Sequence, residues 1–126
     1  MPTPATIQRF VTRVEQGAHA DAIAEFYTTA ASMQENEQPP RIGRDVLVAN
    51  ERNVLARAGA VRSRCVGAPF VDGDRVVIRW VFEFDWHDGT STRIDELALQ
   101  RWEGERIAEE KFFYDPSQMR PRPGVT

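Results

Sequence analysis

The segment from residue 74 to residue 115 alternates polar and apolar residues over three long stretches separated by tight turns. An alternation with a period of two is typical of β-strands that bury one face. The turns contain Asp88-Gly89 and Glu103-Gly104, where glycine permits the positive φ that short hairpin connections require. The pattern therefore predicts an antiparallel sheet with strands over residues 75–86, 91–103 and 106–115.

Helices are expected before this sheet. Thr3-Pro4 is a typical helix start, and Gly17 is placed to end the first helix. A second helix is predicted over residues 20–28, and a third begins at Gly43-Arg44-Asp45 and ends at Gly59. Two further strands are expected, over residues 32–35 and 61–71.

One face of the strand over residues 75–86 is entirely apolar, whereas the other is mixed. The apolar face is formed by Val76, Ile78, Trp80, Phe82, Phe84 and Trp86. Such a face is expected to lie under the helices. The predicted fold class is therefore α+β, a curved antiparallel sheet packed on one side by three N-terminal helices. Residues 1–116 are expected to form a single domain, with a loose tail over residues 117–126.

Size and charge limit the classes of function. With 126 residues and a net charge of −3, the chain has the size of one domain and no basic footprint for nucleic acid. It contains no apolar run of the ~20 residues that cross a bilayer. Cys65 is the only cysteine, so no intrachain disulfide can form, and the first residues show no secretory signal. We therefore expect a cytoplasmic protein that binds neither nucleic acid nor a membrane.

Known cofactor motifs are not visible in the sequence. No cluster of His, Cys, Asp and Glu has the spacing of a zinc site, and no glycine-rich loop suits a phosphate. We expect no metal and no cofactor.

Three local patterns follow one another in the order that a known superfamily shows. They are Gln8-Arg9-Phe10 followed by Gly17, then Pro40-Arg41-Ile42-Gly43-Arg44-Asp45, and then Trp102-x-Gly104-x-x-Ile107 followed by Phe113-Tyr114-Asp115. Together with the element order, they resemble the nuclear transport factor 2-like superfamily, and within it the SnoaL-like proteins related to polyketide cyclases and ketosteroid isomerases. The resemblance implies a cystatin-like roll in which helices and sheet enclose a cone-shaped cavity. This fold hosts enzymes and non-enzymes alike.

The ketosteroid isomerases offer a template for catalytic positions. Their general-base aspartate corresponds here to Glu35, their oxyanion tyrosine to Phe10 and their protonated aspartate to Ala98. Because two of these three positions lack a polar group, the resemblance implies a SnoaL-like protein with a different chemistry.

If Ala98 faces the cavity, the period of two brings Glu96 to the same face, with Trp102 at the mouth. A carboxyl group in apolar surroundings has a raised pKa, which suits acid–base work near neutral pH. We therefore predict Glu35 as a general base and Glu96 as its partner acid. The residues expected to contact a ligand are Phe10, Tyr27, Trp80, Phe82, Phe84, Ala98 and Trp102.

Other interpretations of the two carboxyl groups stay open. Glu35 could be a solvated loop residue beside Glu37, and Glu96 could form a buried salt bridge with an arginine such as Arg79, Arg93 or Arg101. A register error of one residue would exchange Glu96 and Asp95.

Three functions therefore compete at this stage. The first is proton-transfer catalysis, without a cofactor, on a hydrophobic carbonyl or hydroxyl compound, by isomerisation, cyclisation, dehydration or hydrolysis. The second is a non-catalytic module that binds a small ligand or dimerises. The third is a purely structural interaction domain in which the helices fill the cavity and the outer sheet face carries the function. A homodimer through the open sheet face is expected because that face is apolar. The residues expected on it are Val77, Val81, Leu97, Leu99, Phe112 and Tyr114.

Overall fold

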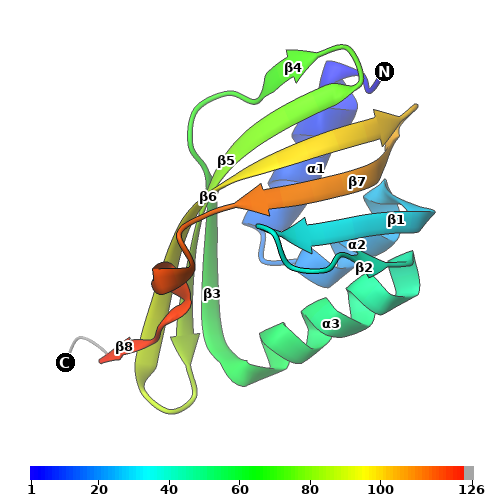
Figure 1. Cartoon of the computed structure of the whole chain (residues 1–126). Coiled ribbons are helices and arrows are strands. Elements are labelled where there is room, and N and C mark those ends of the chain that lie inside the picture. The colour runs from blue at the N-terminus through cyan, green and yellow to red at the C-terminus, as the bar shows by residue number, and fades with distance from the viewer. Residues whose placement is uncertain (124–126) are drawn as a thin grey trace.

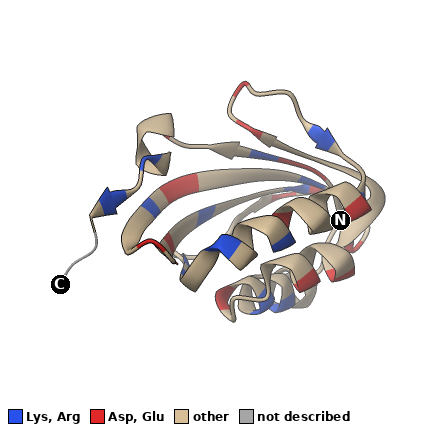
Figure 2. Cartoon of the chain, turned by 90° about the horizontal axis from the view of Figure 1, so that it is seen from below, with Lys and Arg blue, Asp and Glu red and all other residues tan. Residues whose placement is uncertain are grey.

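In the computed structural model, which describes residues 1–123, three helices lie on one side of a curved sheet (Figure 1). The helices are α1 (Pro4–Glu15), α2 (His19–Phe26) and α3 (Arg44–Arg57). Seen from below, the sheet curves over the helices, which gather on its concave side (Figure 2). The predicted fold class, an α+β roll with helices on one face of the sheet, is confirmed.

The sheet has the strand order β2-β1-β7-β6-β5-β3, with β4 paired to β5 and β8 paired to β6. Neighbouring strands run antiparallel except β1 and β7, which run parallel. The sheet is therefore mostly, rather than wholly, antiparallel. The strands are β1 (Tyr27–Glu35), β2 (Arg41–Ile42), β3 (Ala58–Cys65), β4 (Phe70–Asp72), β5 (Arg75–Trp86), β6 (Thr90–Glu103), β7 (Arg106–Phe113) and β8 (Arg122–Pro123).

The ends of α1 follow the signals in the sequence. The hydroxyl of Thr3 accepts a hydrogen bond from the backbone N–H of Thr6, and Pro4 occupies the first turn, where its missing N–H is not needed. Gly17 follows the helix with φ 82°, the left-handed conformation that glycine adopts without strain. These contacts fix where α1 begins and ends.

Several predicted boundaries were wrong. The second helix ends at Phe26, and β1 begins at once with Tyr27, so this strand is longer than the predicted stretch over residues 32–35. The third helix ends at Arg57, before Gly59. The strand expected over residues 61–71 is divided into β3 and β4, because Gly67 has φ 74° and Pro69 offers no N–H to a ladder.

The apolar face of β5 packs under the helices as predicted. Val76, Ile78 and Trp80 are almost completely buried there. Phe10 of α1 lies edge-on against Trp80 and Trp102, with ring centroids 6.5 and 6.1 Å apart. Burying an aromatic or aliphatic side chain of this size contributes about 1.5–3 kcal/mol, so these contacts hold the helical layer on the sheet.

A β-bulge in β7 changes which side chains face the helices. Trp102 pairs with Ile107, but the preceding Arg101 pairs with Glu109, so Ala108 is an extra residue in the ladder. Strict alternation from Ile107 would turn Phe112 outward. Beyond the bulge, however, Glu110 and Phe112 point inward.

Two residues predicted for the outer, dimer-forming face are therefore misplaced. Phe112 lines the internal cavity, and the hydroxyl of Tyr114 reaches Glu35 on β1. Val81 is on the outer face but is already buried within the monomer. Leu97 and Phe113, which face each other across β6 and β7, remain 45% and 42% exposed.

The tail expected to be loose instead packs along β6 as far as Pro123. A short 3₁₀ helix, η1 (Pro116–Met119), precedes β8, which pairs with the first residues of β6. The side-chain amide of Gln118 accepts a hydrogen bond from the backbone N–H of Asp95 at 2.7 Å and donates one to its carbonyl oxygen at 3.3 Å. One glutamine side chain thus fills the gap in the ladder between β7 and β8. The end of the predicted tail, residues 124–126, lies outside the described residues.

No helix within residues 1–123 is both long enough and apolar enough to cross a membrane.

Candidate functional site

A cavity of about 780 Å³ lies between the concave face of the sheet and the helices. This is within the usual range of ~300–1,000 Å³ for small-molecule sites. It extends from Phe10 on α1 to the hairpin between β5 and β6, where Met119 and Pro121 of the tail also line it. Seven of the residues predicted for the site line it, namely Phe10, Tyr27, Glu35, Trp80, Phe82, Phe84 and Glu96.

Ala98 and Trp102 were predicted to contact a ligand but are absent from the cavity wall. Ala98 faces inward but is completely buried beneath the wall. Trp102 is 1% exposed and packs against Phe10, at the opposite end of β6 from the hairpin, so its predicted place at the mouth was wrong. Both residues support the wall rather than form it.

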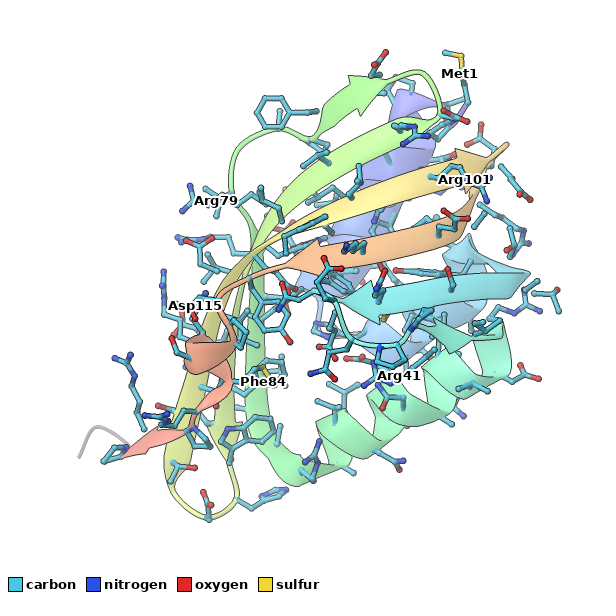
Figure 3. All side chains as sticks on the ribbon, viewed as in Figure 1. Met1, Arg41, Arg79, Phe84, Arg101 and Asp115 are labelled. Carbon is cyan, nitrogen blue, oxygen red and sulfur yellow. The ribbon has the colours of Figure 1, made fainter. Side chains whose placement is uncertain are left out.

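Four aromatic rings of β5 form a continuous apolar wall. Trp80 stacks on Phe82 with centroids 5.4 Å apart, and Phe84 stacks on Trp86 with centroids 5.0 Å apart. The β-strand period places all four on the same face, so the sequence alone located this wall. Figure 3 shows Phe84 and Arg41 on the side of the sheet that faces α3, and Arg79 on the opposite side.

The register of β6 turns Glu96 into the cavity and Asp95 away from it. Glu96 lies directly across from Trp80 in the ladder. Asp95 forms a bidentate pair with Arg79 on the outer face, with N–O distances of 3.0 and 2.7 Å. Arg101, another proposed partner of Glu96, pairs instead with Glu103 and Glu109.

Glu96 is a buried acid without a counter-charge. It is 7% exposed, and no group within residues 1–123 forms a hydrogen bond or an ion pair with its carboxyl. Burial, together with the charges of Glu110, Glu35 and Glu51, raises the pKa of this carboxyl to about 9. Glu96 is therefore a neutral carboxylic acid at pH 7, with a proton to donate.

Glu35 sits in a different environment on the same cavity. Its side chain is 35% exposed, and its Oε2 lies 3.4 Å from Nη2 of Arg41 on β2. Its Oε1 accepts a hydrogen bond of 3.1 Å from the hydroxyl of Tyr114. Glu37, the expected solvent-exposed neighbour, pairs separately with Lys111. Glu35 is therefore a half-buried carboxylate held in place by an arginine and a tyrosine.

A second buried acid, Glu110, was missed from the sequence because of the bulge at Ala108. Its carboxyl accepts hydrogen bonds from the hydroxyl of Tyr27 and from the amide of Gln100, the latter at 2.6 Å. Burial raises the pKa of Glu110 to about 7, although both hydrogen bonds act in the opposite direction. Burial, together with Glu110, also raises the pKa of Tyr27 well above its ordinary value. The hydroxyl of Tyr27 therefore donates its hydrogen bond to Glu110.

His19, the first residue of α2, also lines the cavity. Its Nδ1 lies 3.3 Å from Oε1 of Glu51 on α3, and its Nε2 lies 2.6 Å from Oγ of Ser63 on β3. These contacts join residues that are far apart in the chain, so no local sequence pattern predicts them. Both ring nitrogens are occupied, so His19 ties α2 to α3 and β3.

Metal ligation is not supported by any cluster in the described part of the chain, where no three His, Cys, Asp or Glu side chains are grouped closely enough to hold an ion. The arrangement instead offers proton chemistry. Among the acidic side chains that line the cavity, Glu96 is a neutral acid without a partner in the described residues and Glu35 is a paired carboxylate.

Comparisons with known proteins agree with the fold. A model of the SnoaL-like domain matches residues 7–110. No curated protein matches the chain.

Solved structures that are similar share the fold at low sequence identity. A protein from Catenulispora acidiphila with a ketosteroid isomerase-like fold, in complex with trimethylamine, is 18% identical with a TM-score of 0.76, over 92% of this chain and 89% of that one. A protein from Mesorhizobium loti, assigned as a SnoaL-like polyketide cyclase, is 20% identical with a TM-score of 0.75, over 90% and 100%. An LEH-like epoxide hydrolase from M. tuberculosis is 12% identical with a TM-score of 0.74, over 91% and 84%.

Proposed function

Because the chain belongs to the SnoaL-like domain family, and because its cavity is apolar and bordered by two different carboxyl groups, we propose that it catalyses proton transfer on a hydrophobic small molecule without a cofactor. Glu96 acts as the acid and Glu35 as the base. The wall of Trp80, Phe82 and Phe84 binds the apolar body of the substrate.

The observation that carries this proposal is the state of Glu96. A carboxylic acid that stays protonated at pH 7 and points into a cavity, with no partner among the described residues, is suited to donate a proton to a bound oxygen or nitrogen. A purely structural acid is normally paired, because an unsatisfied buried polar group is unfavourable by about 1–3 kcal/mol. Glu110, which has two hydrogen-bond donors, is such a structural acid.

Glu35 supplies the complementary step. Its carboxylate removes a proton from a carbon next to a carbonyl or from a water molecule, while Glu96 protonates or hydrogen-bonds the acceptor atom. A step in which Glu35 takes a proton and Glu96 gives one leaves Glu35 protonated and Glu96 ionised. Loss of the proton from Glu35 to solvent and uptake of a proton by Glu96 from solvent then restore both groups. Among the structural relatives, the epoxide hydrolase from M. tuberculosis and the cyclase from Mesorhizobium loti make hydrolysis and cyclisation reasonable classes to test.

The test uses two probes, styrene oxide for water addition and 2-tetralone in deuterated water for exchange of the proton next to the carbonyl. We expect turnover of at least one probe, and Glu96→Gln and Glu35→Gln each to lower it about 10²–10⁴-fold. Glu109→Gln, which removes an exposed carboxylate outside the cavity, is the matched control and should keep the wild-type rate. Wild-type turnover in Glu96→Gln would refute the assigned acid.

A second candidate function is ligand binding without turnover. It is favoured by the contact between Glu35 and Arg41, because a carboxylate that is engaged by an arginine is less free to approach a substrate proton. Under this alternative, the aromatic wall binds a ligand in wild type and in Glu35→Gln alike, and neither probe is converted.

A further inference from the structure

The charges around the cavity favour one sign of ligand. Among the residues that the structure describes, five acidic side chains line the cavity and only two arginines do. The acids are Glu35, Glu51, Asp88, Glu96 and Glu110, and the arginines are Arg41 and Arg57. An excess of one sign in a low-dielectric cleft selects ligands of the opposite charge.

Neither of these two arginines forms an ion pair with Glu96. Arg41 pairs with Glu35, and Arg57 lies over the ring of Trp86 at 5.9 Å from its centroid. Glu96 has no such partner within residues 1–123, and the charges that act on it are all carboxylates. The cavity wall therefore holds a buried acid that lacks a cationic partner among the described residues.

Aromatic rings surround the same position. Trp80 is the direct cross-strand neighbour of Glu96, and its ring continues into the stack with Phe82. The negative face of an aromatic ring attracts ammonium groups, and tryptophan attracts them best. A cationic nitrogen at this position could therefore make an ionic contact with the carboxyl of Glu96 and a cation–π contact with the aromatic rings.

The same acidic groups disfavour the binding of a negatively charged ligand. A ligand that enters with a full negative charge would lie near Glu96 among the acidic groups of Glu35, Glu51 and Glu110. Like charges at short range in an apolar cavity repel strongly. The same groups stabilise a ligand that carries or develops positive charge.

We propose that the cavity selects hydrophobic cations, either amines or quaternary ammonium compounds, with Glu96 as the charge partner and the rings of β5 as the surrounding wall. The inference rests on the proposed function only in using the same cavity, because it concerns binding and requires no turnover. Entry of the cation converts Glu96 from the neutral acid to the carboxylate, and its proton leaves to the solvent.

Three probes of the same shape test the sign of the charge. They are benzyltrimethylammonium, neopentylbenzene and phenylmethanesulfonate, which are positive, neutral and negative, respectively. At pH 9 we expect calorimetric titration to show the cation binding at least about tenfold more tightly than the neutral compound, as desolvated cation–π and ionic contacts allow. We expect no binding of the anion. Equal binding of the three probes, or no binding of the cation at millimolar concentration, would overturn the proposal.

The pH dependence identifies the group that binds the cation. Benzyltrimethylammonium has a fixed charge, so any change in its affinity with pH reports on the protein. Because the fraction of ionised Glu96 rises tenfold per pH unit below its pKa of about 9, affinity should rise about tenfold from pH 7.5 to pH 8.5 and level off above pH 9. The titratable and charged groups facing Glu96 from neighbouring elements are His19, Tyr27, Glu35, Arg41, Glu51, Glu110 and Tyr114.

Glu96→Gln keeps the size of the side chain but cannot ionise, so it should bind the cation with no pH dependence between pH 7.5 and pH 9. The control Glu109→Gln should keep the wild-type pH dependence. A slope that persists in Glu96→Gln would assign the released proton to another carboxyl, such as Glu110, and would refute the role of Glu96. Cation binding without conversion of styrene oxide or 2-tetralone would support this inference and contradict the proposed catalysis. Conversion of either probe without cation binding would support the catalysis and contradict this inference.

Discussion

Replacing Glu96 with glutamine should change how the stability of the fold depends on pH. Burial raises the pKa of this carboxyl from its ordinary 4.5 to about 9 in the folded protein. At any pH between these two pKa values, Glu96 keeps its proton in the folded protein but loses it in the unfolded chain. A folded state that binds more protons loses stability as pH rises. Wild type should therefore be progressively destabilised relative to Glu96→Gln between pH 5 and pH 9.

The size of this effect follows from one proton per molecule. From pH 6 to pH 8 the difference in the free energy of unfolding between wild type and Glu96→Gln should change by roughly 3 kcal/mol, because one bound proton acts over two pH units. Glu110, whose pKa lies near 7, titrates in both proteins, and its contribution cancels in the difference. The side chain of Glu96 is 7% exposed, so solvent screening reduces the effect only slightly.

Urea unfolding at pH 6, 7 and 8, followed by tryptophan fluorescence, measures the free energy of unfolding of each protein. Glu109→Gln is the control, because this exposed carboxylate lies on the outer face beside Arg101. Its difference from wild type should stay constant over the three pH values. A constant difference for Glu96→Gln as well would mean that Glu96 is ionised in the folded protein. The proposed acid would then have no proton to donate.

Two further predictions concern the surfaces around the site. Gln118→Ala removes both hydrogen bonds to the backbone of Asp95 and should lower stability by about 1–3 kcal/mol, with faster hydrogen exchange at the Asp95 amide than in wild type; unchanged exchange there would show that η1 does not protect the strand. We also propose that the exposed pair Leu97 and Phe113 forms part of a homodimer interface, so sedimentation equilibrium should show dimers at micromolar concentration and monomers for Leu97→Asp. A wild-type monomer at that concentration would reject the interface.

The sequence predicted best those features that a single strand period determines. The strand over residues 75–86 and its aromatic face were correct to the residue, because twelve residues of strict alternation leave only one face to bury. The inward position of Glu96 followed from the same period in β6. No insertion disturbs the alternation between Thr92 and Gln100, where every second side chain is buried.

Features that depend on one extra residue or on one side chain were not predictable. The bulge at Ala108 is a single unpaired residue in β7, and it reversed the expected orientation of Phe112 and concealed Glu110. The tail has no hydrophobic period because its attachment depends on the amide of Gln118, which takes the place of a strand neighbour. The contact of His19 with Glu51 joins two helices and exists only after they pack.

The different roles proposed for the two carboxyl groups follow from their neighbours rather than from their own chemistry. Both are glutamates on the same cavity, yet Arg41 and Tyr114 stabilise the charge of Glu35, while Glu96 has only carboxylates and aromatic rings around it. Surroundings that differ in this way can give an acid role and a base role to the same residue type. The sequence predicted both glutamates and the role of each, but it did not predict the contact of Glu35 with Arg41. This arginine lies on a two-residue strand, and its approach to Glu35 depends on the pairing of β2 with β1.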